Sequence, residues 1–238
     1  MPDNTQPPRS QPDQSDLSLL DRACDGDDTA ARTLMQRHNQ GLFRAAWSLL
    51  GNAQDAEEAL QESYIKAFSR PHHYRGASSY ATWMTRIVIN EALAMRRNRQ
   101  RRARLLEARG ISVLPEGDDR ETPLFSTRPA SPEDAAFRSQ VSRKIEAALA
   151  NLDRDFRTVF ILRDVQGFST AEAAFALEIP EATVKTRLLR ARRALRAQLA
   201  PELVDALGGI FPFAGPRCEA LADRVIAQLH NLRKGNSS

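Results

Sequence analysis

The chain has 238 residues, a length that suits two small domains or one domain with long tails. Hydrophobic residues make up 42% of it and the net charge is only +4, but a pI near 9.4 reflects local basic blocks that favour nucleic acid as a partner. Cys24 and Cys218 are too few for a disulfide framework or a four-thiolate metal site. No export signal or membrane-spanning apolar run is visible, so we expect a cytoplasmic protein without membrane insertion.

The N-terminal part predicts a disordered tail followed by two helices. Residues 1–15 are rich in Pro, Gln and Asp and have little apolar surface to offset the entropy of ordering. A helical pattern begins at Asp16, breaks at residues 26–28, and resumes over residues 30–50 until the turn at Gly51. The apolar face expected for the first helix consists of Leu17, Leu20, Ala23 and Cys24.

Two further helices are predicted before the middle of the chain. Residues 55–69 form one of them, with acidic side chains near its N-terminus, where they favour the positive end of the helix dipole. After a loop at residues 71–79, residues 80–104 form another, which is apolar and aromatic in its first half and rich in arginine in its second. A single helix would therefore be buried at one end and cationic at the other.

The remaining pattern predicts a linker, a second helical domain and an extension. Residues 105–132 form the linker, because the stretch from 110 to 132 contains Pro and Gly at intervals. Phe137, Val141, Ile145 and Leu149 recur every four residues, and another helix is expected over residues 156–164. We therefore predict an all-α chain with a disordered tail at residues 1–15, small helical domains at 16–104 and 133–200 on a flexible tether, and a 201–238 extension with one helix at 218–232.

The clearest motif is a helix-turn-helix at residues 169–196. Ser169 and Glu172 have the spacing of a capping box, and Pro180 separates a short first helix from a second helix over residues 181–199. The second helix carries a dense stripe of Lys and Arg and offers side chains that can reach base edges when its N-terminus enters a major groove. A solvated surface helix is the alternative interpretation of such a stripe.

Motifs in both halves resemble one family. Residues 55–68, the Tyr74-Arg75-Gly76 run and residues 82–90 resemble region 2 of bacterial sigma-70 factors, and the helix-turn-helix resembles their region 4. With only a linker between them, the chain is similar to the extracytoplasmic function (ECF) group over about residues 16–104 and 133–199. The resemblance implies an RNA polymerase sigma factor that binds core polymerase, recognises -35 and -10 promoter elements and promotes strand opening. It also implies an anti-sigma factor as a partner.

The resemblance assigns protein-binding roles to one helix and base-reading roles to two others. Contacts with the polymerase β′ coiled coil are implied for Asp55, Glu58, Gln61 and Glu62, and a contact of region 4 with the β flap is implied as well. Those acids could instead serve only solubility and the helix dipole. Contacts with the -35 element are implied for Thr183, Lys185, Thr186, Arg187, Leu189 and Arg190.

The resemblance places the -10 element and strand separation on Tyr74, Arg75, Ser79, Tyr80, Trp83, Arg86 and Asn90. Aromatic rings suit this task because an exposed base can stack on them, although a Trp in an apolar helix is more often a core residue, and the same alternative holds for Tyr80. Backbone phosphates upstream would be bound by Arg96, Arg97, Arg99 and Arg101, which adds affinity without sequence choice.

The chain departs from the family pattern in the turn and in the extension. Glu178 stands where the family usually has Gly, so a left-handed backbone is expected there at a cost of about 1 kcal/mol. The helix at residues 218–232 lies beyond the usual end of region 4, and it could cover the helix-turn-helix, bind a regulator or be an accessory helix. No pattern assigns a redox role to either cysteine.

Other function classes have little support in the sequence. No P-loop, dinucleotide turn or metal-ligand spacing is present, and the adjacent His72 and His73 would point apart, so we expect no enzyme, cofactor or metal. The main rival is a DNA-binding regulator that needs no polymerase and uses residues 16–104 for dimerisation or effector binding. A third class is a module whose basic helices bind RNA or acidic proteins.

Overall fold

A computed structural model of the chain describes residues 15–69, 74, 76–109, 144–145, 147–199 and 216–235. These ranges are helical with short connections, and no strand occurs within them, which confirms the all-α class. The elements are α1 (Asp16–Asp25), α2 (Asp28–Leu50), α3 (Ala53–Ser69), α4 (Tyr80–Glu107), α6 (Arg154–Phe160), the π-helical turn η2 (Ile161–Val165), α7 (Thr170–Leu177), α8 (Glu181–Arg196) and α10 (Pro216–Gly235).

The helix ends follow the turn signals in the sequence. Gly26 ends α1 in a left-handed conformation at φ 105°, and the carboxylate of Asp27 then caps α2 by accepting from the backbone N–H groups of Thr29 and Ala30. Gly51 ends α2 in the same way at φ 73°. The predicted breaks are therefore confirmed at Gly26, Asp27 and Gly51, whereas Asp28 is already the first residue of α2.

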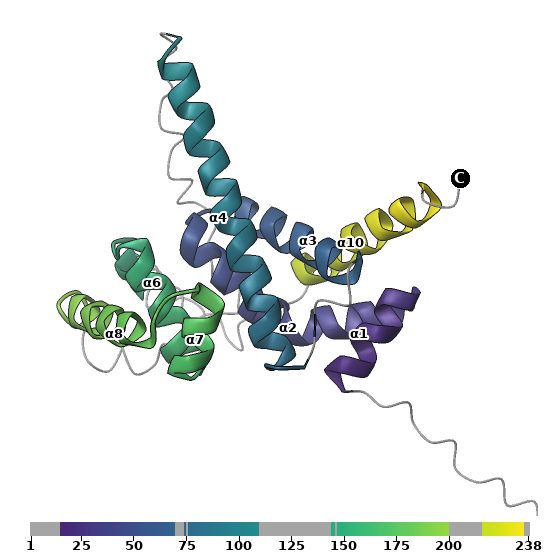
Figure 1. Cartoon of the computed structure of the whole chain (residues 1–238). Helices are drawn as coiled ribbons and strands as arrows, with labels where there is room; N and C mark the ends of the chain where they lie inside the picture. The colour runs from purple at the N-terminus through teal and green to yellow at the C-terminus, as the bar shows by residue number, and fades with distance from the viewer. Residues whose placement is uncertain are drawn as a thin grey trace, which may run out of the picture.

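Helices α1 to α4 form a bundle in which α2 contacts each of the other three (Figure 1). Tyr64 of α3 and Met84 of α4 are fully buried in its core. The face predicted for α1 is wrong at one position: the Leu17 side chain is 51% exposed, whereas Leu19 is only 2% exposed. Leu19, Leu20 and Ala23 have the spacing that turns one face of α1 toward α2, and Leu17 in the first turn lies off that face.

The C-terminal half contains the predicted helix-turn-helix. Val184 and Leu188 of α8 are buried together with Ala173 and Ala176 of α7, whose small side chains allow the helices to cross closely. The helix expected at residues 156–164 is α6 continued by η2, and α8 ends at Arg196 instead of the expected Leu199. Of the four residues that predicted the preceding helix, Ile145 and Leu149 are described, and both are buried.

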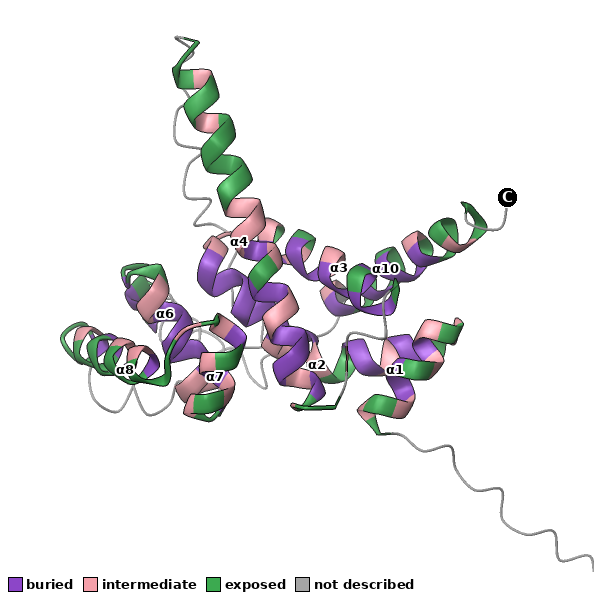
Figure 2. Cartoon of the chain, in the orientation of Figure 1, coloured by how far each residue is buried: buried purple, intermediate pink, exposed green. Residues whose placement is uncertain are grey.

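The two halves pack directly against each other. Helix α2 contacts α6 and η2, α4 contacts α7, and one hydrophobic core extends through both halves. In Figure 2 the buried surfaces of α2, α4, α6 and α7 turn toward the middle of the molecule. The sequence suggested modules that act separately on a tether, but the stretch at residues 110–132 and the tail at 1–14 lie outside the described residues, so the domain boundaries stay a prediction.

Two helices extend from this body. The arginine-rich half of α4 projects outward and is largely exposed (Figure 2), while α10 lies against α3 and α2 (Figure 1). The helix predicted at residues 218–232 is thus found within α10. Among the helices that the structure describes, none is both long and apolar enough to cross a membrane.

Candidate nucleic-acid interface

The entry into α8 is fixed by local hydrogen bonds and by one strained residue. The Ser169 hydroxyl accepts from the Glu172 N–H at 3.1 Å, and the Ser169 N–H donates to the Glu172 carboxylate at 2.8 Å, which confirms the capping box. Because the carboxylate accepts these bonds, first of all from the backbone N–H, the pKa of Glu172 is lowered. Glu178 adopts the expected left-handed conformation at φ 54°, so a side chain is held where glycine is favoured.

The first turns of α8 present the residues predicted to read the -35 element. Lys185, Thr186, Leu189 and Arg190 are exposed, and Leu189 reaches 69% exposure, whereas Thr183 and Arg187 are half-buried. The Arg190 guanidinium lies 6.0 Å from the ring centre of Phe156. Together with Phe156 and its neighbours, four of them border an open groove of about 530 Å³: Thr183, Thr186, Arg187 and Arg190. An exposed cationic helix beside a groove can approach a duplex without rearrangement of the C-terminal half.

Two arginines of α8 are held by acids of the same half. Arg187 forms an ion pair with Asp155. Arg192 donates two hydrogen bonds of 2.7 Å to the carboxylate of Asp164, and these bonds raise the pKa of Arg192. These pairs fix the position of α8 on α6 and η2, and they leave Lys185 and Arg190 as the exposed cations of the first turns.

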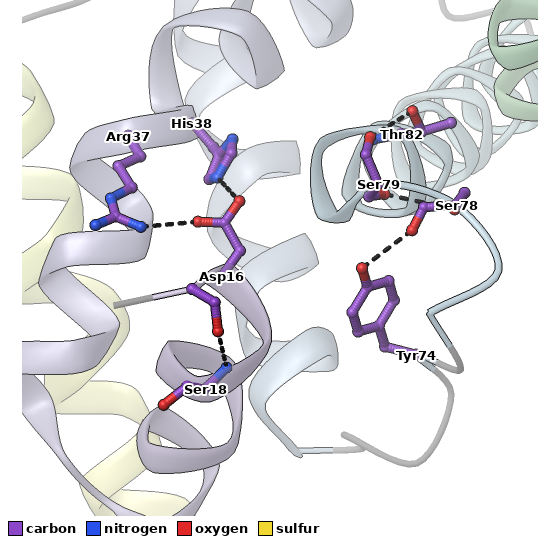
Figure 3. A network of polar contacts seen from close by, with 9 residues as sticks. Asp16, Ser18, Arg37, His38, Tyr74, Ser78, Ser79 and Thr82 are labelled. Atoms are coloured by element: carbon purple, nitrogen blue, oxygen red, sulfur yellow. Dashed lines mark hydrogen bonds and ion pairs between the residues drawn. The ribbon is translucent and has the colours of Figure 1, made fainter. Parts of the chain in front are cut away.

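The aromatic residues predicted for the -10 element are packed inside the bundle. Tyr80 is 2% exposed and Trp83 is 9% exposed. The Tyr74 ring lies 5.1 Å from that of Trp83 and 6.1 Å from that of Tyr80, and its hydroxyl donates to the Ser78 carbonyl at 3.0 Å (Figure 3). Burial raises the pKa of Tyr80. In this conformation both buried rings act as core side chains, so base stacking by them stays a prediction that requires a different conformation.

A polar network at the start of α1 supports the aromatic cluster. The Asp16 carboxylate accepts from Arg37 at 3.0 Å and contacts Nε2 of His38 at 2.8 Å (Figure 3). The His38 ring lies 4.9 Å from the ring of Tyr80. Burial lowers the pKa of His38, and the nearby Asp16 opposes this effect. The network therefore holds the His38 ring in place against Tyr80.

The first turns of α4 are covered by the helix-turn-helix. Thr82 donates to the Glu172 carboxylate at 3.1 Å, and Nε of Arg86 donates to the Glu178 carboxylate at 2.9 Å. The Arg86 guanidinium also lies 4.7 Å from the ring centre of Phe175. Of the other predicted -10 residues, Ser79 and Asn90 are exposed, and Arg75 lies outside the described residues.

A second contact between the halves centres on a buried arginine that sequence reasoning missed. Arg157 of α6 is 4% exposed, donates from Nε to the Ser48 carbonyl of α2 at 2.7 Å, and lies 5.1 Å from the ring centre of Trp47. Beside it, the Ser48 hydroxyl donates to the Thr158 hydroxyl at 2.9 Å. The only signal in the sequence is that Arg157 lies three residues before the apolar Phe160, on the same helix face.

The candidate phosphate-binding and polymerase-binding residues lie on neighbouring surfaces. Arg97, Arg99 and Arg101 are exposed on the projecting half of α4, and Arg96 is half-buried. Arg99 pairs with Asp55 of α3 at 2.7 Å. Glu58 is exposed, Glu62 is half-buried, and Gln61 is hydrogen-bonded to α10, a contact that the sequence did not predict. Within the described residues, no group of three or more His, Cys, Asp or Glu side chains is placed to hold a metal ion.

Comparisons with known proteins bear on both halves. The family described as sigma-70 region 2 matches residues 34–102, and the one described as sigma-70 region 4 matches residues 142–195. ECF RNA polymerase sigma factor SigM of Mycobacterium tuberculosis is 30% identical over 183 residues, which cover 77% of this chain and 84% of that protein. The chain belongs to the ECF group of the sigma-70 family. It is thus an RNA polymerase sigma factor, as the resemblance predicted.

Other ECF and sigma relatives match over a similar extent. RNA polymerase sigma-H factor of Pseudomonas aeruginosa is 29% identical over 195 residues, which cover 81% of this chain and 98% of that protein. Among solved structures, the sigma factor RpoE in complex with the anti-sigma factor NepR from Bartonella quintana has a TM-score of 0.53 at 25% identity and covers 68% of this chain and 91% of that chain. CnrH in complex with the cytosolic domain of CnrY shares the fold with a TM-score of 0.50 at 23% identity, covering 78% of this chain and 96% of that chain.

Proposed function

We propose that this sigma factor binds core RNA polymerase through α3, reads the -35 element with the start of α8, and reads the -10 element with the start of α4 and the loop before it. The observation that carries the proposal is the exposed pair of cations, Lys185 and Arg190, on the second helix of a capped helix-turn-helix. Such side chains in a major groove bind guanine edges or phosphates, depending on their position along the helix.

Access of promoter DNA to the start of α4 requires α7 to move away from it. Tyr80 and Trp83 are buried, and the Thr82–Glu172 and Arg86–Glu178 contacts place α7 over the start of α4. Polar contacts at a partly exposed interface exchange readily for contacts with a partner. We therefore assign the described arrangement to the chain without polymerase, and base capture to an opened form.

The acids of α3 and the arginines of α4 serve the remaining contacts. Glu58 and Glu62 lie one helical turn apart, and their charge requires a basic surface, which the β′ coiled coil would supply. Arg97 and Arg101 lie on the projecting half of α4 and would bind phosphates at the upstream edge of the opened DNA. Region 4 would contact the β flap.

An anti-sigma factor is proposed as a further partner, because the structure of the similar sigma factor RpoE contains the anti-sigma factor NepR. We place this regulation in the cytoplasm and assign no catalytic role to the chain.

Transcription in vitro with purified core polymerase and a library of genomic fragments tests the proposal. The full chain should direct initiation at a defined set of start sites, and Glu58→Lys with Glu62→Lys should abolish co-purification with core polymerase. The matched control is Asp21→Lys with Asp25→Lys on α1, which reverses two exposed acids at the same spacing. If the α3 and α1 variants bind core polymerase equally well, α3 does not form the interface.

Measurements of binding by the chain alone separate the rival functions. A regulator that needs no polymerase would bind its duplex sites with full affinity when alone, whereas a sigma factor binds duplex promoters weakly until it joins core polymerase. An RNA-binding or acidic-protein-binding module would keep its ligand in the presence of excess duplex DNA.

A further inference from the structure

Helix α10 is docked on α2 and α3 along its apolar side. Leu221, Val225 and Leu229 recur every four residues and are buried, as is Cys218 at the start of the helix. The Asn39 amide of α2 donates to the Cys218 sulfur at 2.9 Å. Helix α10 therefore packs on the region 2 core.

The polar side of α10 binds the acidic flank of α3. Nε of Arg217 donates to the Glu57 carboxylate at 2.8 Å, and the Arg224 guanidinium lies 3.3 Å from the same carboxylate. Arg224 also donates to the Gln61 side-chain oxygen at 3.1 Å, while the Gln61 side-chain nitrogen donates to Gln228 at 3.0 Å. Both ends of the Gln61 amide are thus occupied by α10.

The rest of α10 is held by α1 and α2. Asp223 pairs with Arg32 at 2.6 Å, and the His230 ring contacts Asp28 at 3.0 Å. In the last turns, Arg233 donates to the carbonyl of Ala23 at 3.0 Å. In Figure 1 α10 passes beside α3 and continues past the bundle. These contacts fix one register of α10 on the bundle.

We propose that α10 is a built-in competitor of core polymerase for α3. It brings a basic helical surface to an acidic one, which is the same charge complementarity that α3 needs from a coiled-coil partner. Gln61 cannot bind both α10 and polymerase, so α10 must leave before the full α3 surface is available. This inference rests on the proposed role of α3, and it assigns to the C-terminal extension the function of lowering the affinity for core polymerase until α10 is displaced.

The expected size of the effect follows from the population of the open form. When a partner binds only the form in which a site is uncovered, its apparent dissociation constant equals the intrinsic constant divided by the fraction of molecules in that form. Exposed ion pairs such as Arg32–Asp223 are individually weak, so a partner can replace these polar contacts of α10. Reversal of the charges that face Glu57 should therefore raise the uncovered fraction without any change on α3.

The test measures core-polymerase affinity for the full chain and for Arg217→Glu with Arg224→Glu. The charge-reversed chain should bind about tenfold more tightly. Addition of Glu57→Arg to these two changes recreates the contact with opposite charges and should restore the weaker binding of the unmodified chain. The matched control reverses Arg109 at the tip of α4 and Lys234 in the last turn of α10, both exposed, and should leave the affinity unchanged.

A second readout uses the unmodified chain and does not depend on folding of a variant. Cys218 lies on the face of α10 that is buried against α2, so its alkylation, followed by mass spectrometry of its peptide, reports departure of the helix. Core polymerase should make Cys218 reactive. If the unmodified and charge-reversed chains bind core polymerase equally, or Cys218 stays protected in the complex, the competitor role is wrong while the sigma function stands. If neither chain binds core polymerase, the proposed role of α3 fails and the competitor role fails with it.

Discussion

The start of α8 and the start of α4 are both proposed to read promoter DNA, yet the structure presents them differently. On α8, Lys185 and Arg190 are exposed, whereas on α4 Tyr80 and Trp83 are buried and Arg86 is paired with Glu178. The difference follows from the chemistry of the side chains. Cations are well solvated at a surface, but aromatic rings gain free energy when they are buried. A helix that reads bases with aromatic rings therefore closes when it has no DNA, while a cationic helix stays open.

Two contacts between the halves keep the start of α4 covered, and they differ in strength. Arg157 is buried and bonds the Ser48 carbonyl, so its loss leaves polar groups without partners in the interior. The Arg86–Glu178 pair is partly exposed, with 38% and 52% of its side chains accessible, so it is replaceable. The contact between α2 and α6 acts as the anchor, and the contact between α4 and α7 is the part that can open.

The largest effect is expected from Arg157→Ala. This change leaves the Ser48 carbonyl unsatisfied and removes the contact with Trp47, so the free energy of unfolding should fall by about 3 kcal/mol. Urea denaturation measures it. Arg154→Ala on the same helix removes an exposed arginine and should change stability by less than about 0.5 kcal/mol. Equal effects of the two changes would show that Arg157 is not an anchor.

A smaller effect is expected at the exposed start of α8. If Arg190 contacts a base edge, Arg190→Ala should reduce discrimination at one -35 position by about 1 to 3 kcal/mol. A comparison of transcription from matched and singly substituted promoters measures this loss of discrimination. Arg193→Ala, an exposed change farther along α8, should weaken all promoters alike. A uniform loss for Arg190→Ala would remove it from base reading.

Glu178→Gly should change stability still less, because two effects of similar size oppose each other. Glycine relieves the left-handed backbone by about 1 kcal/mol, and loss of a partly exposed ion pair with Arg86 costs about 0 to 1 kcal/mol. Glu178→Gln keeps the backbone strain but weakens the pair, so in urea denaturation it should be less stable than the glycine variant. The reverse order would mean that the Arg86 contact outweighs the strain.

The helix-turn-helix contains residues that were predictable because their signals are local. The capping box at Ser169 depends on neighbours within a few residues, as do the turn glycines that end α1 and α2, whereas the left-handed Glu178 was expected from the family resemblance. The contacts of Arg157 with Ser48 and of Arg224 with Gln61 join residues more than 100 positions apart, and no periodic pattern specifies them. For the same reason the apolar first half of α4 was recognisable, whereas the packing of α7 over it was not.

The smallest expected effect is a pH dependence at the α7 cap. The pKa of Glu172 is lowered in the folded chain, so the cap contributes fully above the carboxyl's ordinary value of 4.5 and is lost as the pH falls through its lower folded value. The free energy of unfolding should therefore decline in this acidic range. Glu172→Gln removes the titrating group and should flatten that part of the profile. An unchanged acid slope would assign it to other carboxylates.

The distance between the two halves during binding of core polymerase tests the central claim most directly. Fluorescent labels at two exposed positions, Leu17 on α1 and Ala197 just after α8, would report it by energy transfer in the full chain. The closed form predicts a single distance without polymerase and a longer one in the complex that initiates transcription. A distance that does not lengthen while transcripts are made would contradict the account, because the -10 face of α4 would then be used without being uncovered.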